Sequence, residues 1–75
     1  MPIDFNQYLT PDQKRSILEQ RLAQFAAEAF QHDINRKVAE QSGDANLVTA
    51  SEQALTVLEQ AMTVHEQELQ GLDTP

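Results

Sequence analysis

The second half of the chain carries a seven-residue pattern of apolar and polar positions. Residues 51–71 read SEQALTV, LEQAMTV and HEQELQG, so each kind of side chain returns after seven residues. Such a repeat is typical of a helix that keeps one face against a neighbouring helix over several turns. The pattern predicts a long helix and indicates no chemistry.

The repeat places its apolar residues on one broad side of that helix, at roughly 100° of rotation per residue. Adjacent stripes are formed by Leu55, Met62 and Leu69, by Ser51, Leu58 and His65, by Ala54 and Ala61, and by Val57 and Val64. Together they span an arc of roughly 160°, which is wider than a two-stranded coiled coil requires. We expect one partner helix to leave part of the arc uncovered, and the alanines to allow another helix to approach closely.

The first helix has a clear start signal at Thr10. Threonine can cap a helix, Pro11 suits the first helical position, and Gln13 can complete a capping box. No breaker follows until Gly43, which can adopt the left-handed conformation that ends many helices. The sequence predicts a helix over residues 11–41.

The second helix has two candidate caps, Asp44 and Thr49. Leu47 and Val48 continue the apolar stripes upstream, which favours the earlier start. Gly71 is the expected end, so the predicted helix covers residues 45–70. Two long helices joined by a short turn form an antiparallel hairpin.

The predicted fold class is therefore all-α: an antiparallel two-helix hairpin over residues 11–70, an extended apolar arm over residues 1–10 and a short tail over residues 71–75. A chain of 75 residues is one domain at most and buries little core by itself. We expect it to complete a helical bundle by forming a homo-oligomer or by docking on a partner.

A turn near Gly43 sets the expected register between the two helices. It places Lys14 or Arg15 near Asp73, and Arg21 near Glu66. The same register places Phe30 near Leu58. The apolar pattern of the first helix also changes from 3-4 spacing to pure spacings of four, which predicts a stripe that winds round the helix along Leu22, Ala26, Phe30, Ile34 and Val38.

The apolar positions give two sets of candidate interaction residues. The expected interface consists of Leu22, Phe25, Ala54, Leu55, Leu58, Ala61, Met62 and Leu69. The N-terminal arm contributes Ile3, Phe5, Tyr8 and Leu9. A floppy tail is usually poorer in large apolar residues, so we expect the arm to pack, either on its own hairpin or on a partner.

The charge is unevenly distributed along the chain. The net charge is −7; residues 1–43 carry all five bases and six acids, whereas residues 44–75 carry six acids and no base. Binding to a nucleic-acid backbone requires lysines and arginines, so the acidic half argues against direct nucleic-acid binding. Glutamates on the polar face likewise argue against a membrane partner. The chain has no cysteine, and the lack of a signal-peptide pattern favours a cytoplasmic location.

The candidate chemical groups do not form a reactive site. His32 and His65 lie several turns apart in the expected hairpin, and neither has the Glu-x-x-His spacing of metal sites in helical bundles. We therefore expect no metal, and we assign both histidines structural roles. No serine has a histidine at a convincing spacing, and the two glycines form no phosphate-binding loop. The sequence predicts a protein that is not an enzyme and needs no cofactor.

The layout of two long helices and one short turn resembles the Rop family of small hairpin proteins. The resemblance concerns architecture and implies a dimeric four-helix bundle. Rop-like proteins bind RNA, a role to which the acidic second helix is poorly suited. Short acidic helical chains without cysteine also occur among bacteriophage proteins, which makes virion association an alternative location.

Two functions remain open at this point. The first is a protein–protein interaction or assembly module, because the apolar arc is too wide for one helix. The alternative is an acidic inhibitor, a nucleic-acid mimic that binds a nucleic-acid-handling protein. Its candidate residues form an acidic face of Glu52, Glu59, Glu66 and Glu68.

Overall fold

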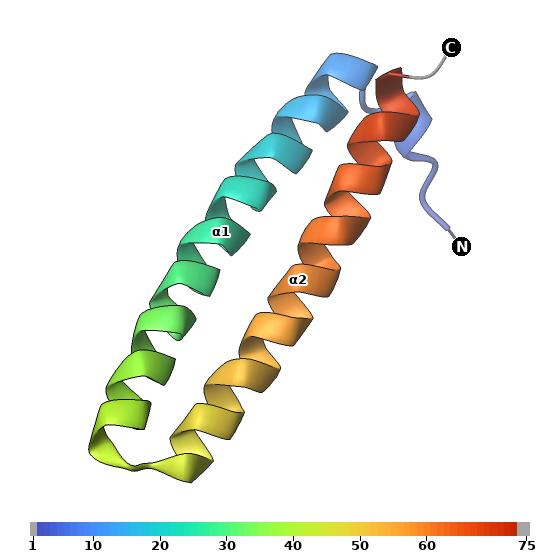
Figure 1. Ribbon diagram of the computed structural model, residues 1–75. Helices are drawn as coiled ribbons and strands as arrows, with labels where there is room; N and C mark the ends of the chain where they lie inside the picture. Colours follow the sequence, from blue (N-terminus) through green and yellow to red (C-terminus); the bar gives the residue numbers. More distant parts are fainter. Residues whose placement is uncertain (1, 74–75) are drawn as a thin grey trace.

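The computed structural model describes residues 2–73 and shows an antiparallel helical hairpin (Figure 1). A short 3-10 helix, η1 (Phe5–Gln7), precedes two long helices, α1 (Pro11–Ser42) and α2 (Ala45–Asp73). No strand occurs within the described residues. The predicted all-α hairpin is confirmed. The molecule is elongated, with principal extents of 51 × 26 × 17 Å.

The predicted helix starts are also confirmed. Thr10 and Gln13 form a capping box, in which the Thr10 hydroxyl accepts from the Gln13 backbone N–H at 3.2 Å and Gln13 Oε1 accepts from the Thr10 N–H at 2.8 Å. Gly43 ends α1 with a φ of 74°, in the left-handed region. Asp44 then caps α2, because its Oδ1 accepts from the Leu47 N–H at 3.1 Å.

The predicted end of α2 at Gly71 is wrong, because the helix continues to Asp73. Gly71 lacks the positive φ that would stop a helix. The extra turn is held by an ion pair of 2.6 Å between Arg15 and Asp73, and by half-buried Leu72. Residues 71–73 of the predicted tail are therefore helical, while residues 74–75, like Met1 of the arm, lie outside the described residues.

The contact between the helices follows regular 3-4 spacing along α1. Its half-buried or buried residues are Leu18, Leu22, Phe25, Ala29, His32, Arg36 and Ala39. On α2 the buried residues are Ser51 and Leu58. Phe30, in contrast, is 66% exposed, so its expected packing near Leu58 is wrong. Leu22 of the winding stripe contacts α2, but the later members Ala26, Phe30, Ile34 and Val38 are exposed. The polar residues His32 and Arg36 take the inner positions near the turn.

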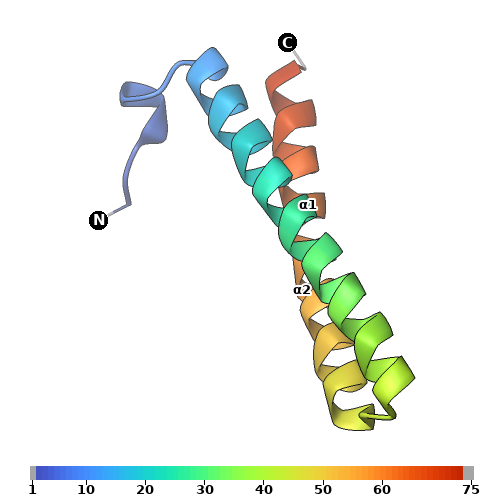
Figure 2. The same ribbon diagram turned by 90° about the vertical axis from the view of Figure 1, so that its left-hand side faces the viewer.

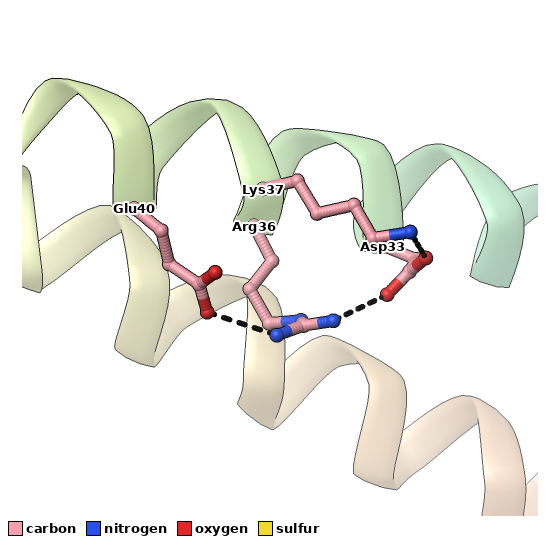
Figure 3. A network of polar contacts seen from close by, with 4 residues as sticks. All are labelled: Asp33, Arg36, Lys37 and Glu40. Atoms are coloured by element: carbon pink, nitrogen blue, oxygen red, sulfur yellow. Dashed lines mark hydrogen bonds and ion pairs between the residues drawn. The ribbon is translucent and has the colours of Figure 1, made fainter.

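A polar network explains how Arg36 can occupy such a position (Figure 3). Its guanidinium contacts Asp33 at 2.7 Å and Glu40 at 2.9 Å, and Lys37 contacts Asp33 at 3.0 Å. Hydrogen bonds from Arg36 and Lys37 lower the pKa of Asp33 below its ordinary value of 3.8. The Asp33 carboxylate in turn raises the pKa of Arg36. The charged groups are thus satisfied within α1 itself.

The sequence predicted an extended N-terminal arm, but the arm is not extended throughout. Asp4 caps the 3-10 turn by accepting from the Asn6 N–H at 3.1 Å, and this local bond folds the chain over Phe5–Gln7. Lys14 of α1 donates to the Asn6 side chain and ties the arm to the hairpin. Figure 2 shows the arm standing to one side of the hairpin's open end.

Candidate interaction surfaces

A cluster of three residues holds the helices together in the half farther from the turn. The rings of Phe25 and His65 meet edge to face, with centroids 4.9 Å apart and planes at 82°. Arg21 lies over the Phe25 ring, 5.3 Å from its centroid, and donates to His65. The sequence predicted that Arg21 lies near Glu66. In the structure Arg21 pairs with the neighbouring residue, His65. The cluster gives His65 a packing role.

The expected interface residues divide between buried and half-buried positions. Leu58 is buried at 9% exposure. The remaining residues are half-buried: Leu22, Phe25, Ala54, Leu55, Ala61, Met62 and Leu69. The hairpin thus brings these residues to one side of each helix and covers them only in part.

One side of α2 presents an apolar surface that α1 covers only in part, here called the neutral face. Its members follow 3-4 spacing and are Leu47, Ala50, Ala54, Val57, Ala61 and Val64. Val57 is 63% exposed and Val64 is 54% exposed. The neutral face has one edge farther from α1. On a helical wheel this edge is formed by the uncharged residues Asn46, Gln53 and Gln60. A charge-free border is compatible with an apolar contact.

A second surface, here called the acidic groove, lies where α1 and α2 meet. Its apolar floor contains Ala29, Leu55 and Met62, and its rim contains Glu59 and Glu66. These two glutamates, like Glu52 and Glu68, are exposed and form no ion pair within residues 2–73. All cations of the described chain lie on α1. The groove therefore combines apolar contact area with uncompensated negative charge.

The arm forms a third feature, an open cleft of about 580 Å³ against the helix ends. Ile3, Phe5 and Leu9 line it from the arm, while Ile17 and Leu72 line it from the helices. Leu9 is half-buried, but Ile3, Phe5 and Tyr8 are exposed. The arm thus lies on its own hairpin through Leu9 and still presents most of its apolar surface to solvent.

Seven exposed apolar residues of the helices were not among the expected interaction residues: Ile17, Phe30, Ile34, Val38, Leu47, Val57 and Val64. Phe30 was expected in the core, and Val57 was counted only as part of the wide arc. Their exposure depends on which residues of α1 face α2, and the polar identity of His32 and Arg36 concealed that choice. The 3-4 spacing of residues 18–39 was the signal that could have revealed it.

Comparisons with protein families, with curated proteins and with solved structures found no match for this chain. Within the described part of the chain, no group of histidines, cysteines and acids is arranged to hold a metal ion. Among the same residues, neither helix has the length and apolar character needed to cross a bilayer.

Proposed function

We propose that this protein is a non-enzymatic interaction module that assembles with other protein surfaces, its own or those of a larger complex. The observation that carries the proposal is the exposure of Val57 and Val64 on a regular apolar stripe of α2. Isolated apolar residues on a surface are ordinary, but a stripe at 3-4 spacing over five turns is typical of a helix with a second neighbour.

The small core supports the same proposal. The buried apolar residues within the described chain are Ala39 and Leu58. A core of this size contributes little free energy, and chains without disulfides commonly gain stability from association. A partner that covers the neutral face adds the apolar burial that the hairpin lacks. Cytoplasmic and virion-associated locations are both compatible with such a module.

The test is the stability of the hairpin when the partner is present at a known concentration. Anything that binds the folded state raises the melting temperature in a concentration-dependent way. Val64→Lys should remove this increase, because it places a charge in the apolar contact, whereas Thr56→Lys serves as a control of equal charge at an exposed position outside both surfaces of α2. Equal behaviour of the two variants would contradict the proposal.

A second candidate is an acidic inhibitor of a nucleic-acid-handling protein, and the acidic groove favours it. The unpaired Glu59 and Glu66 beside Leu55 and Met62 suit a basic partner surface with apolar side chains between its cations. Replacing Glu52, Glu59 and Glu66 with glutamine removes charge at similar helix propensity.

The two candidates differ in their response to that triple substitution. An inhibitor should lose affinity for its basic target by about 100-fold or more, and binding by the parent should weaken steeply with salt. An assembly module should keep its affinity. The measurement is calorimetric titration of parent and variant at two salt concentrations.

A further inference from the structure

We infer that the neutral face binds a second copy of this chain, with the two α2 helices antiparallel, so that two hairpins form one four-helix bundle. The inference rests on the proposed function and specifies its partner. It follows from the spacing of the apolar residues, from the placement of charge around them and from the surface area of the single hairpin.

The spacing of the neutral face is the same in both directions along the helix. From Leu47 to Val64 the intervals are 3, 4, 3, 4 and 3 residues. A twofold axis between Ala54 and Val57 therefore brings every member opposite another member. Leu47 faces Val64 of the second copy, Ala50 faces Ala61, and Ala54 faces Val57. Ala54 thus meets the larger Val57, Leu47 and Val64 meet at the ends of the contact, and the Ala50–Ala61 pairs allow the two helices to approach closely.

No charge lies on the neutral face between Leu47 and Val64. Glu68, four residues beyond Val64 on the same side of α2, falls outside this stretch, opposite Gly43 of the second copy. Glu52, Glu59 and Glu66 precede or follow Leu55 and Met62 by three or four residues, which puts them beside the acidic groove. The neutral face is bordered by Gln53 and Gln60 instead. Two acidic helices can therefore approach through this one face without aligning their glutamate rows.

The solvent-exposed area of one hairpin is larger than that of a compact monomer of the same mass. A compact monomer of 8.4 kDa exposes about 4,600 Å², whereas this chain exposes 5880 Å². The excess of about 1,300 Å² per chain, if buried by both copies, gives an interface of about 2,600 Å². This lies within the range of about 2,000–5,000 Å² found for obligate homodimers.

The same arrangement accounts for exposed apolar residues at both ends of the hairpin. The arm lies at the open end, with Ile3 and Phe5 exposed, and the turn end carries exposed Val38 and Leu47. Antiparallel α2 helices bring the arm of each copy beside the turn of the other. Each copy thus offers an apolar arm to the end where its partner exposes apolar side chains.

The test measures the mass of the full chain in solution over a wide concentration range. Sedimentation equilibrium should give the mass of two chains for the parent and for Thr56→Lys. Val57→Lys should raise the dissociation constant by at least about 100-fold, because it places a charge at the centre of the contact. Both positions are exposed in the single hairpin, so both variants should keep their helicity by circular dichroism.

Crosslinking then tests the orientation, because the chain contains no cysteine. A mixture of Ala54→Cys and Val57→Cys chains should form a disulfide-linked heterodimer under mild oxidation. The acidic-groove variant Glu59→Cys, mixed with either chain, should not.

Any of three results would overturn the inference: a monomeric parent at millimolar concentration, equal dissociation constants for Val57→Lys and Thr56→Lys, or efficient crosslinking through Glu59→Cys. If the chain is a monomer but gains stability from a different protein, the partner is not a second copy, and the proposed function still holds.

Discussion

Arg21 and His65 join the two helices by a side-chain hydrogen bond, in which Nε of Arg21 donates to Nε2 of His65 at 2.9 Å. Because Nε2 accepts, the ring proton of neutral His65 lies on Nδ1, which is 2.6 Å from the carbonyl oxygen of Ala61. The imidazole is therefore fixed by both helices. It is a packing residue with satisfied polar atoms, and a metal would have to displace both contacts.

The first prediction concerns this cluster. His65→Ala removes the edge-to-face contact with Phe25, and loss of such a ring pair costs about 0.5–1.5 kcal/mol beyond the buried area. His65→Gln keeps an acceptor for Arg21 and should be less destabilising. Urea unfolding followed by circular dichroism measures the difference.

Replacing both His32 and His65 with glutamine should leave partner binding intact; loss of binding without unfolding would assign a histidine a direct role.

The second prediction concerns the start of α1. Thr10→Ala removes the acceptor for the Gln13 N–H and should lower the free energy of unfolding by about 0.5–2 kcal/mol. Thr56→Ala is the matched control, because the Thr56 hydroxyl donates to the Glu52 carbonyl within the helix and caps nothing. That control should be neutral or slightly stabilising, since alanine is the better helix former. An equal loss in both variants would show that the cap is not the cause.

Local signals predicted the ends of the elements well wherever one residue decides the outcome. Thr10, Gly43 and Asp44 act through their own side chain or φ angle, and the structure shows all three in the expected roles. The end of α2 was missed because Gly71 has no positive φ in the structure, and the helix continues to Asp73, which pairs with Arg15 of α1. A glycine with no positive φ does not stop a helix.

The inner face of α1 could not be chosen from hydrophobicity alone. Phe30 is a stronger apolar signal than Arg36, yet Arg36 is half-buried and Phe30 is exposed. The ion pairs within α1 make the arginine acceptable near the turn, and such pairs depend on side-chain geometry. The neutral face was foreseen as part of a wide arc, but which part remains uncovered follows only from the packing of α1 on α2.

The third prediction concerns pH and the network at Asp33. Its pKa is lowered from an ordinary 3.8, first by the hydrogen bond from Arg36 and then by that from Lys37. A group with a lowered pKa in the folded state stabilises the protein above the unfolded value, and this contribution is lost as the pH falls through the folded pKa. The stability of the parent should therefore fall below about pH 4.

Asp33→Asn separates that contribution from the titration of other acids. The variant should be less stable than the parent at pH 7, and the difference should shrink as the pH is lowered from 4 towards 2. Melting temperatures by circular dichroism at each pH provide the measurement. A difference that stays constant over this range would show that the ionised carboxylate does not support the fold.

The last prediction contrasts a buried residue with an exposed one of similar apolar character. Leu58 is 9% exposed at the centre of the helix contact, whereas Phe30 is 66% exposed on the outer side of α1. Leu58→Ala should cost about 2–5 kcal/mol. This is close to the whole of the roughly 3–5 kcal/mol that a core of this size supplies, so the variant should be largely unfolded at low protein concentration. Phe30→Ala should change stability by less than about 0.5 kcal/mol, since little apolar area is lost from the core. Urea titrations at several protein concentrations separate folding from association, because only association depends on concentration. If Phe30→Ala proved as destabilising as Leu58→Ala, Phe30 would belong to the folded core, and the described packing of α1 would be wrong.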